Sequence, residues 1–182
     1  MTLKEYFKKM RGTSRGSPPR VSNSEIIWSW IGAFLGISAV AWFNNYWFGG
    51  NDFTLLIGSF GASAVLVYGA VRSPLGQPRN LVGGHVLSAI IGVLSWKLFY
   101  ADPWLASALA VATAIAVMHL TRTLHPPGGA TALIAVIGSD QIHEIGFMYV
   151  LIPATFGPLI LLVIALLVNN LSSTRRYPEI WW

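Results

Sequence analysis

Residues 124–134 read Leu124-His125-Pro126-Pro127-Gly128-Gly129-Ala130-Thr131-Ala132-Leu133-Ile134, and this stretch decides the fold. It sets an ionisable ring, two prolines and two glycines between apolar runs that are typical of membrane spans. In hydrocarbon, an unpaired backbone N–H or C=O costs several kcal/mol. The stretch therefore predicts an interrupted segment whose break lies against protein or water rather than lipid.

The residues after the break favour a new helix. Proline suits the first helical turn because its missing N–H would have no partner there, and glycine lets another group approach the backbone. Free N–H groups at a helix start, together with the positive end of the helix dipole, bind anions. The candidate substrate-binding residues here are His125, Pro126, Pro127, Gly128, Gly129 and Thr131. The alternative is a broken helix whose glycines serve only close packing.

The composition excludes a soluble domain. Of 182 residues, 54% are hydrophobic and 10% are charged, and the mean hydropathy is +0.57, which predicts one compact integral membrane domain. Because cysteine is absent, disulfides, thiol nucleophiles and cysteine metal sites are excluded. The net charge of +5 comes from terminal segments and short loops, which indicates membrane topology and no nucleic-acid partner.

Six apolar segments predict an all-α integral membrane protein. They cover residues 26–48, 53–71, 81–99, 104–120, 126–138 and 146–168. The fifth is too short to cross a core of about 30 Å as a helix alone. Pro153, Gly157 and Pro158 predict a kink in the sixth.

The flanking sequence completes the predicted organisation into three parts. Residues 1–24 form a cytoplasmic basic segment with an amphipathic helix suited to anionic lipids, followed by a linker over residues 12–19. Residues 25–171 form the transmembrane domain, and residues 172–182 form a cytoplasmic C-terminal tail.

The charges support six crossings. With the basic N-terminus in the cytoplasm, inside loops carry Arg72 with Arg79, then Arg122, then Arg175 with Arg176. Outside loops carry Asp52, Asp102, Asp140 and Glu144. Cytoplasmic loops of membrane proteins are enriched in Lys and Arg, so six crossings satisfy this rule at every connection.

Two stretches match at a spacing of 68 residues, from Gly61 to Leu66 and from Gly129 to Ile134. They fall in the second and fifth segments, the middle members of two three-segment halves. Three-span halves insert with opposite orientation, and interrupted helices in corresponding positions mark a midplane site in many transporters. We therefore predict a 3+3 inverted repeat in which Ser59, Gly61 and Ser63 join the substrate-binding residues.

Histidines and one arginine supply a second group of candidates. His85, His119, Arg122 and His125 fall near the cytoplasmic ends of their segments, where they could attract or gate an anion or relay protons. The alternative is that His85 and His119 only pack between helices. A metal site is not favoured, because no carboxylate lies at the same depth and the spacing matches no known ligand pattern.

Enzyme chemistry finds no support in the sequence. The chain lacks Gly-x-Ser-x-Gly, His-Glu-x-x-His and the phosphate-binding Gly-x-x-x-x-Gly-Lys motif, and its apolar segments hold no paired carboxylates. We predict neither an enzyme nor a bound cofactor.

The sequence resembles the HPP family of integral membrane proteins. Residues 124–132 closely resemble the His-Pro-Pro signature of that family, and residues 58–63 and 78–85 are similar to its pattern. The resemblance covers residues 26–170. It implies a nitrite transporter, because members in cyanobacteria and chloroplasts are associated with nitrite transport. The family is usually described with four spans, and our six segments depart from that number.

These observations predict a multi-pass protein that transports a small monovalent anion, with nitrite as the leading candidate, through a midplane site of opposed helix N-termini. The resemblance implies a bacterial or cyanobacterial plasma membrane or a chloroplast envelope, and the charges of the loops predict that both termini are cytoplasmic. The expected partners are the anion, the lipid bilayer and further copies in a homo-oligomer. The alternative is a non-transporting membrane scaffold or sensor that uses its basic N-terminus.

Overall fold

The computed structural model describes residues 2–10, 19–48 and 57–182, and among these residues it contains helices and no strand. The α-helices are α1 (Leu3–Lys9), α2 (Asn23–Phe43), α3 (Ser59–Ala64), α4 (Pro78–Phe99), α5 (Pro103–Leu120), α6 (Pro126–Ile137), α7 (Asp140–Ile145), α8 (Met148–Leu151) and α9 (Phe156–Val168). Wider π turns extend α2 through Asn44–Phe48 and α3 through Val65–Gly69, and 3₁₀ turns cover Pro74–Gly76 and Asn169–Leu171.

The helix starts follow local sequence rules. Pro78, Pro103 and Pro126 each begin a helix, where a residue without an N–H leaves no donor unpaired. Ser22 caps α2 by accepting a hydrogen bond from the Glu25 N–H. Thr2 and Glu5 form a capping box on α1, which confirms a helix within the predicted N-terminal segment. Residues 12–18 of the predicted linker and 53–56 of the second segment lie outside the described residues.

Within the described residues, four helical stretches are long and apolar enough to cross a membrane: Asn23–Trp47, Pro78–Phe99, Pro103–Leu120 and Met148–Leu171. Ser59–Gly69 and Pro126–Ile137 are shorter apolar helices. The all-helical membrane class and the shortness of the fifth segment are thereby confirmed. Large apolar side chains such as Trp30, Leu98 and Leu167 are exposed on the outer surfaces of these stretches, as expected where lipid is the solvent.

The predicted kink in the last apolar segment is a full break. α8 ends at Leu151 and α9 begins at Phe156. Pro153 lies between them. Proline breaks a helix because it has no N–H to donate and because its ring clashes with the carbonyl of the preceding turn. The hydroxyl of Thr155 donates to the carbonyl of Val150 at 2.7 Å and so satisfies one carbonyl freed by the break.

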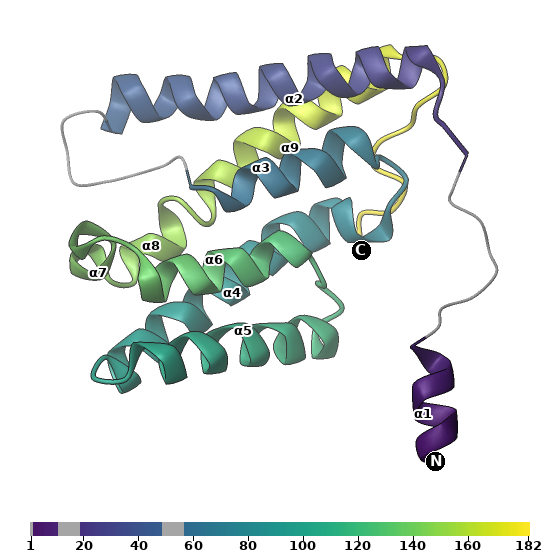
Figure 1. Ribbon diagram of the computed structural model, residues 1–182. Coiled ribbons are helices and arrows are strands. Elements are labelled where there is room, and N and C mark those ends of the chain that lie inside the picture. The colour runs from purple at the N-terminus through teal and green to yellow at the C-terminus, as the bar shows by residue number, and fades with distance from the viewer. Residues whose placement is uncertain (1, 11–18, 49–56) are drawn as a thin grey trace.

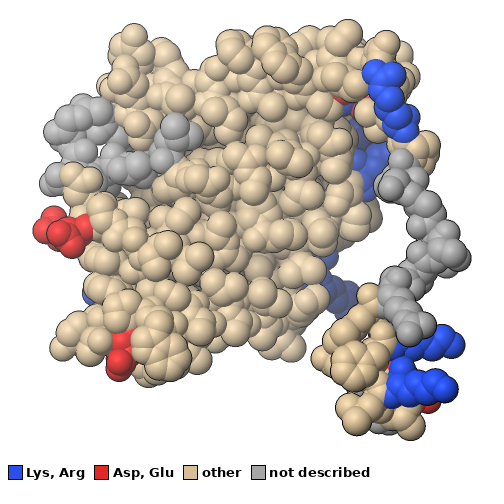
Figure 2. Space-filling view, viewed as in Figure 1, with Lys and Arg blue, Asp and Glu red and all other residues tan. Residues whose placement is uncertain are grey.

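Successive long helices run in opposite directions (Figure 1). α2, α4 and α6 start at one end of the bundle, and α3, α5 and α9 finish there. We call this the basic end, because the connections at it carry Arg20, Arg72, Arg79, Arg122, Arg175 and Arg176. The connections at the other, acidic end carry Asp102, Asp140 and Glu144. Figure 2 shows most of the blue side chains at one end and most of the red ones at the other, separated by a belt of uncharged side chains.

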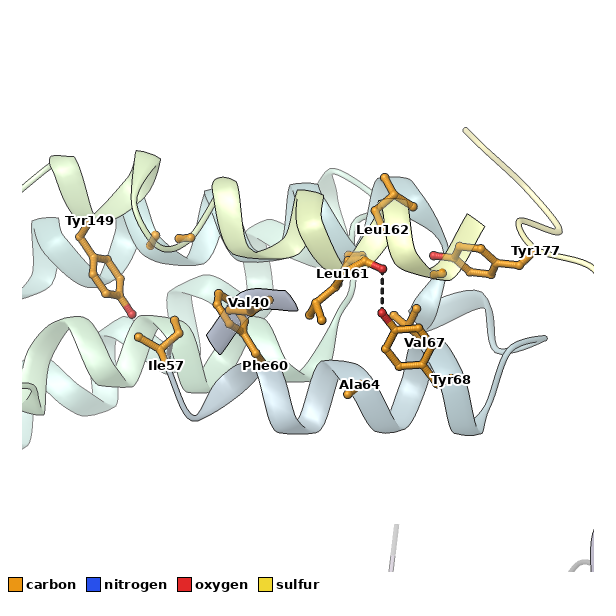
Figure 3. Packing of buried hydrophobic residues seen from close by; sticks show 14 of the residues in the cluster. Val40, Ile57, Phe60, Ala64, Val67, Tyr68, Tyr149, Leu161, Leu162 and Tyr177 are labelled. Carbon is orange, nitrogen blue, oxygen red and sulfur yellow. Dashed lines mark hydrogen bonds between the residues drawn. The ribbon is translucent and has the colours of Figure 1, made fainter. Parts of the chain in front are cut away.

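The larger core lies between α2, α3 and α9 (Figure 3). Gly32 and Gly36 of α2 leave room for the ring of Tyr68, whose hydroxyl donates to the carbonyl of Leu161 at 2.9 Å. A smaller core joins α5 to α6, where alanines of α5 and Met118 pack against Ala132 and Val136. Small side chains at these crossings let the backbones approach, which is how helices associate in lipid.

The C-terminal tail is packed against the bundle at the basic end. The guanidinium of Arg175, 2% exposed, lies 2.8 Å from a carboxylate oxygen of Glu25 and also donates to the carbonyl of Tyr68. The hydroxyl of Tyr177 donates to the carbonyl of Gly76, and the Glu179 N–H donates to the side-chain oxygen of Gln77, both at 2.9 Å. Burial raises the pKa of the Tyr177 phenol, so it stays a neutral donor. The tail therefore holds the connection between α3 and α4.

Candidate functional site

His85 of α4 lies at the centre of a buried polar cluster. Its Nε2 is 2.7 Å from the hydroxyl of Ser63 on α3, and its Nδ1 is 2.7 Å from the hydroxyl of Thr131 on α6. Each of the three side chains has 0% exposure. One ring thus bridges the two short apolar helices through both of its nitrogens.

His125, which directly precedes α6, extends this cluster toward the basic end. Its Nε2 lies 2.9 Å from Ser63 Oγ, and its Nδ1 lies 2.7 Å from the carbonyl oxygen of Leu75. On the other side of His85, Thr131 Oγ1 lies 2.9 Å from Ser59 Oγ. We call Ser59, Ser63, His85, His125 and Thr131 the central cluster.

Glycines of α4 and α6 create the space in which this cluster fits. A Cβ atom on Gly84 would lie 2.5 Å from Cβ of His125, and one on Gly128 would lie 2.8 Å from the carbonyl oxygen of Gly84. One on Gly92 would lie 2.5 Å from the carbonyl oxygen of Ala132. The backbones of α4 and α6 therefore approach closely along about two turns of α4, from Gly84 to Gly92.

Apolar and aromatic groups surround the central cluster. The ring of Phe60 meets His85 edge-on, with the ring centroids 5.3 Å apart, and the rings of His85 and His125 lie 5.0 Å apart. The hydroxyl of Tyr149 on α8 donates to the carbonyl of Thr131 at 3.0 Å. In such surroundings every polar atom needs a partner, because leaving one unpaired is costly.

Sequence reasoning missed three contributors to this site. Tyr149 lies in an apolar run and carries no local signal, and the Leu75 carbonyl is a backbone group that any residue would supply. Ser88 lies three residues after His85 on the same helix face and contacts the sulfur of Met118 at 3.7 Å. Helical periodicity from His85 could have identified Ser88.

The structure divides the predicted site residues into two groups. Ser59, Ser63, His85, His125 and Thr131 meet in the central cluster, with Pro127 and Gly128 buried beside it. Gly61 and Pro126 are exposed, and Gly129 is half-buried against α5 near Val111. His119 and Arg122 are exposed at the end of α5, so the structure does not bring them to the cluster.

The predicted free amides of the two helix starts are mostly paired. Phe60 N–H donates to the carbonyl of Ile57, Gly61 N–H donates to that of Gly58, and Gly128 N–H donates to that of His125. Pro126 and Pro127 have no N–H. In this conformation, hydroxyl and imidazole groups rather than backbone amides are the polar groups gathered between α3 and α6.

The part of the chain that the structure describes holds no group of three or more His, Cys, Asp or Glu side chains that could bind a metal ion. The two histidines of the central cluster point their nitrogens at hydroxyls and a carbonyl.

Comparisons with known proteins give a family and two relatives. The profile of the family described as "HPP, transmembrane region" matches residues 18–178. Two Dictyostelium discoideum proteins, each described as a transmembrane protein, are 46% and 45% identical to the chain over 181 and 186 residues. The alignments cover 98% and 100% of this chain but 58% and 65% of those proteins, so the chain spans less than two thirds of their length. No solved structure matches.

Proposed function

Since the chain belongs to the HPP transmembrane region family and is an integral multi-pass membrane protein, we propose that it transports a small monovalent anion, with nitrite as the leading candidate. Residues 25–171 form the transport domain, and the central cluster is its substrate site. The basic end faces the cytoplasm. The basic N-terminal segment contacts anionic lipids.

The observation that carries this proposal is the burial of five polar side chains from four places in the sequence. Ser59, Ser63, His85, His125 and Thr131 are at most 1% exposed, yet they lie between helices that face lipid. Polar and ionisable groups inside a membrane protein are expensive and usually mark an ion or substrate pathway. Packing alone could have used apolar side chains at all five positions.

An inverted repeat is supported by the contacts of Ser63 and Thr131, which are 68 residues apart. Ser63 Oγ lies 3.2 Å from the carbonyl oxygen four residues before it, and Thr131 Oγ1 lies 3.3 Å from its equivalent. Each hydroxyl also meets one nitrogen of His85. In this repeat the first half is α2, α3 and α4, and the second half is α5, α6 and α9. The contact of α2 with α9 then corresponds to the contact of α5 with α4, which fits two halves of opposite orientation (Figure 1).

Anion recognition then depends on the hydroxyls of Ser59, Ser63 and Thr131 and on imidazole N–H groups. These donors can turn toward a small oxyanion without a permanent charge, so binding stays weak enough for release. The described conformation is closed around the cluster, and transport requires the two halves to open it to each side in turn.

The basic end attracts the anion to this site. Arg72, Arg175 and Arg176 line a cavity of about 510 Å³ beside the start of α2; Glu25 also lines it and is paired with Arg175, so the lining carries a net positive charge. Clefts lined by one sign of charge raise the local concentration of the opposite ion.

Uptake of nitrite into proteoliposomes tests the proposal, with nitrate, formate and chloride as competitors. Thr131→Val keeps the side-chain shape and removes the buried hydroxyl, so it should lower the initial rate at least tenfold. Thr113→Val is the matched control, because Thr113 is exposed on α5 and should leave the rate unchanged. Wild-type uptake no faster than that of empty liposomes would refute transport and favour the scaffold or sensor.

A further inference from the structure

The hydrogen bonds of the central cluster follow one continuous order from Leu75 to Ser59. A neutral imidazole has one N–H and one acceptor nitrogen, and a hydroxyl has one proton. The Leu75 carbonyl can only accept, so Nδ1 of His125 carries the proton and Nε2 accepts. Ser63 gives its proton to that Nε2 at 2.9 Å and therefore accepts from Nε2–H of His85 at 2.7 Å.

The same reasoning fixes the other half of the cluster. Nδ1 of His85 is then an acceptor, and the hydroxyl of Thr131 donates to it at 2.7 Å. In the described geometry the 2.9 Å contact runs from Thr131 Oγ1 to Ser59 Oγ; when the Thr131 hydroxyl turns its one proton to His85, it accepts a proton from Ser59 at the same contact instead. With both hydroxyls turned this way every group has a partner and every proton points the same way. Ser63 and Thr131 also lie 3.2 and 3.3 Å from the carbonyl oxygens of Ser59 and Pro127, which compete for these protons.

On these grounds we propose that the central cluster is a proton relay and that each anion crosses together with one proton. This inference rests on the proposed transport function and names its coupling ion. The physical reason is charge: an anion alone in a buried site is expensive, whereas an anion beside an imidazolium adds no net charge to the interior.

Proton transfer along the relay balances at each step. A proton from hydronium in the aqueous phase binds Ser59 Oγ, whose own proton passes to Thr131. Thr131 passes its proton to Nδ1 of His85, His85 passes the proton of Nε2 to Ser63, and Ser63 passes its proton to Nε2 of His125. Each transfer forms one O–H or N–H bond and breaks another, so His125 becomes an imidazolium and no other group changes its charge.

To release the proton at the basic end, a water molecule must replace the Leu75 carbonyl as the hydrogen-bond acceptor of Nδ1–H of His125. Leu75 is half-buried and lies in the connection that Tyr177 and Glu179 hold through Gly76 and Gln77. Movement of that connection would open the relay on one side only, as a coupled transporter requires.

The groups that face the two rings leave the relay without a fixed counter-charge. His85 faces Phe60 and Ser63 of α3, Thr131 of α6 and the ring of His125. His125 faces Ser63 and the Leu75 carbonyl, and Tyr149 of α8 reaches the cluster at the Thr131 carbonyl. Among the described residues, no hydrogen bond or ion pair joins either ring to Asp, Glu, Lys or Arg. The transported anion is the counter-charge.

The test follows nitrite and protons together in proteoliposomes that contain a pH-sensitive dye. Potassium and valinomycin set the membrane potential, and empty liposomes give the background from nitrous acid that crosses the lipid itself. We expect one proton taken up per nitrite and a rate independent of potential. Nitrite uptake that moves no protons and follows the potential would overturn the relay and leave the transport proposal standing. Absence of nitrite uptake would refute both.

The variant Ser63→Ala distinguishes a cluster that relays protons from one that has only a structural role. It removes the hydroxyl between the two rings, so proton uptake per nitrite should fall at least fivefold, and Ser63→Thr should restore it. Ser107→Ala, on the exposed surface of α5, is the matched control. If Ser63→Ala does not fold, Thr131→Ser against Thr131→Val gives the same comparison at the next link. An unchanged proton-to-nitrite ratio in folded Ser63→Ala or Thr131→Val would overturn the relay.

Discussion

At the scale of single residues, the role of a glycine here depends on the face it occupies. Gly84 is buried against His125 and the Thr123 carbonyl, whereas nothing lies within 4 Å of a Cβ atom placed on Gly61. Both glycines lie in small-residue runs of the sequence, Gly83-Gly84-His85 and Gly61-Ala62-Ser63. Their opposite environments follow from the tertiary packing: Gly84 lies on the face of α4 that meets α6, whereas Gly61 lies on the open face of α3.

Gly84→Ala should destabilise the protein. Its methyl group would meet backbone and Cβ atoms at 2.5–3.0 Å, and these can yield only if the helices move apart. Overpacking of this kind costs about 1–3 kcal/mol. Gly61→Ala should be neutral or stabilising, because alanine favours the helix by roughly 0.5–1 kcal/mol over glycine.

Thermal unfolding in detergent, followed by tryptophan fluorescence, measures both variants. A Gly84→Ala midpoint equal to or above that of Gly61→Ala would mean that the close approach of α4 to α6 is wrong.

Two of the site residues could be predicted from sequence for a clear physical reason. His125 begins a proline-rich helix start, and Thr131 lies one helical turn beyond Pro127, so both signals are local. His119 and Arg122 were predicted by depth in the membrane alone, which does not define the direction in which a side chain points. Whether a residue faces lipid or protein depends on helix rotation, and α5 has apolar residues on every side.

At the scale of elements, the sequence predicted segment positions well and the tail poorly. The boundaries of α4 and α5 lie within a few residues of the predicted 81–99 and 104–120, because prolines mark both starts. The tail was predicted only as a cytoplasmic extension. Its packing depends on Arg175 and Tyr177 meeting groups about 100 to 150 positions away, and no local pattern encodes such contacts.

Arg175→Ala should lower the free energy of unfolding, because it removes the contacts that join the tail to α2. It removes the cation beside Glu25 and the donor to Ser29 and to the Tyr68 carbonyl. Breaking a buried ion pair costs about 3–5 kcal/mol, and we expect the lower part of that range because the Glu25 side chain is 31% exposed.

Arg176→Ala removes the same charge from an exposed side chain and should change the unfolding midpoint little. The same thermal unfolding measurement compares the two. Equal midpoints for the two variants would contradict a structural role for the buried ion pair.

At the scale of the whole molecule, the separation of charge along the bundle predicts its orientation. Residues 102 and 122 flank α5 and so lie at opposite ends of the bundle (Figure 1). If α3 and α6 did not cross, residue 102 would lie on the same side as the N-terminus and residue 122 on the opposite side. If only the four longest helices cross the membrane, residues 102 and 122 therefore lie on the sides opposite to those that six crossings predict.

Single cysteines decide between these arrangements, because the chain has none of its own. In intact cells, a membrane-impermeant maleimide should label Asp102→Cys and not Arg122→Cys. Permeabilised cells, in which both should react, are the control. Labelling of Arg122→Cys alone in intact cells would contradict six crossings with a cytoplasmic N-terminus.

The ion pair between Glu25 and Arg175 also bears on how the chain is made. The two residues are 150 positions apart, so the ribosome delivers the first span to the membrane long before the arginine is synthesised. Until Arg175 is synthesised and docks, the carboxylate at the head of α2 lacks this partner, so the contact between α2 and the tail can form only after the intervening helices have been made.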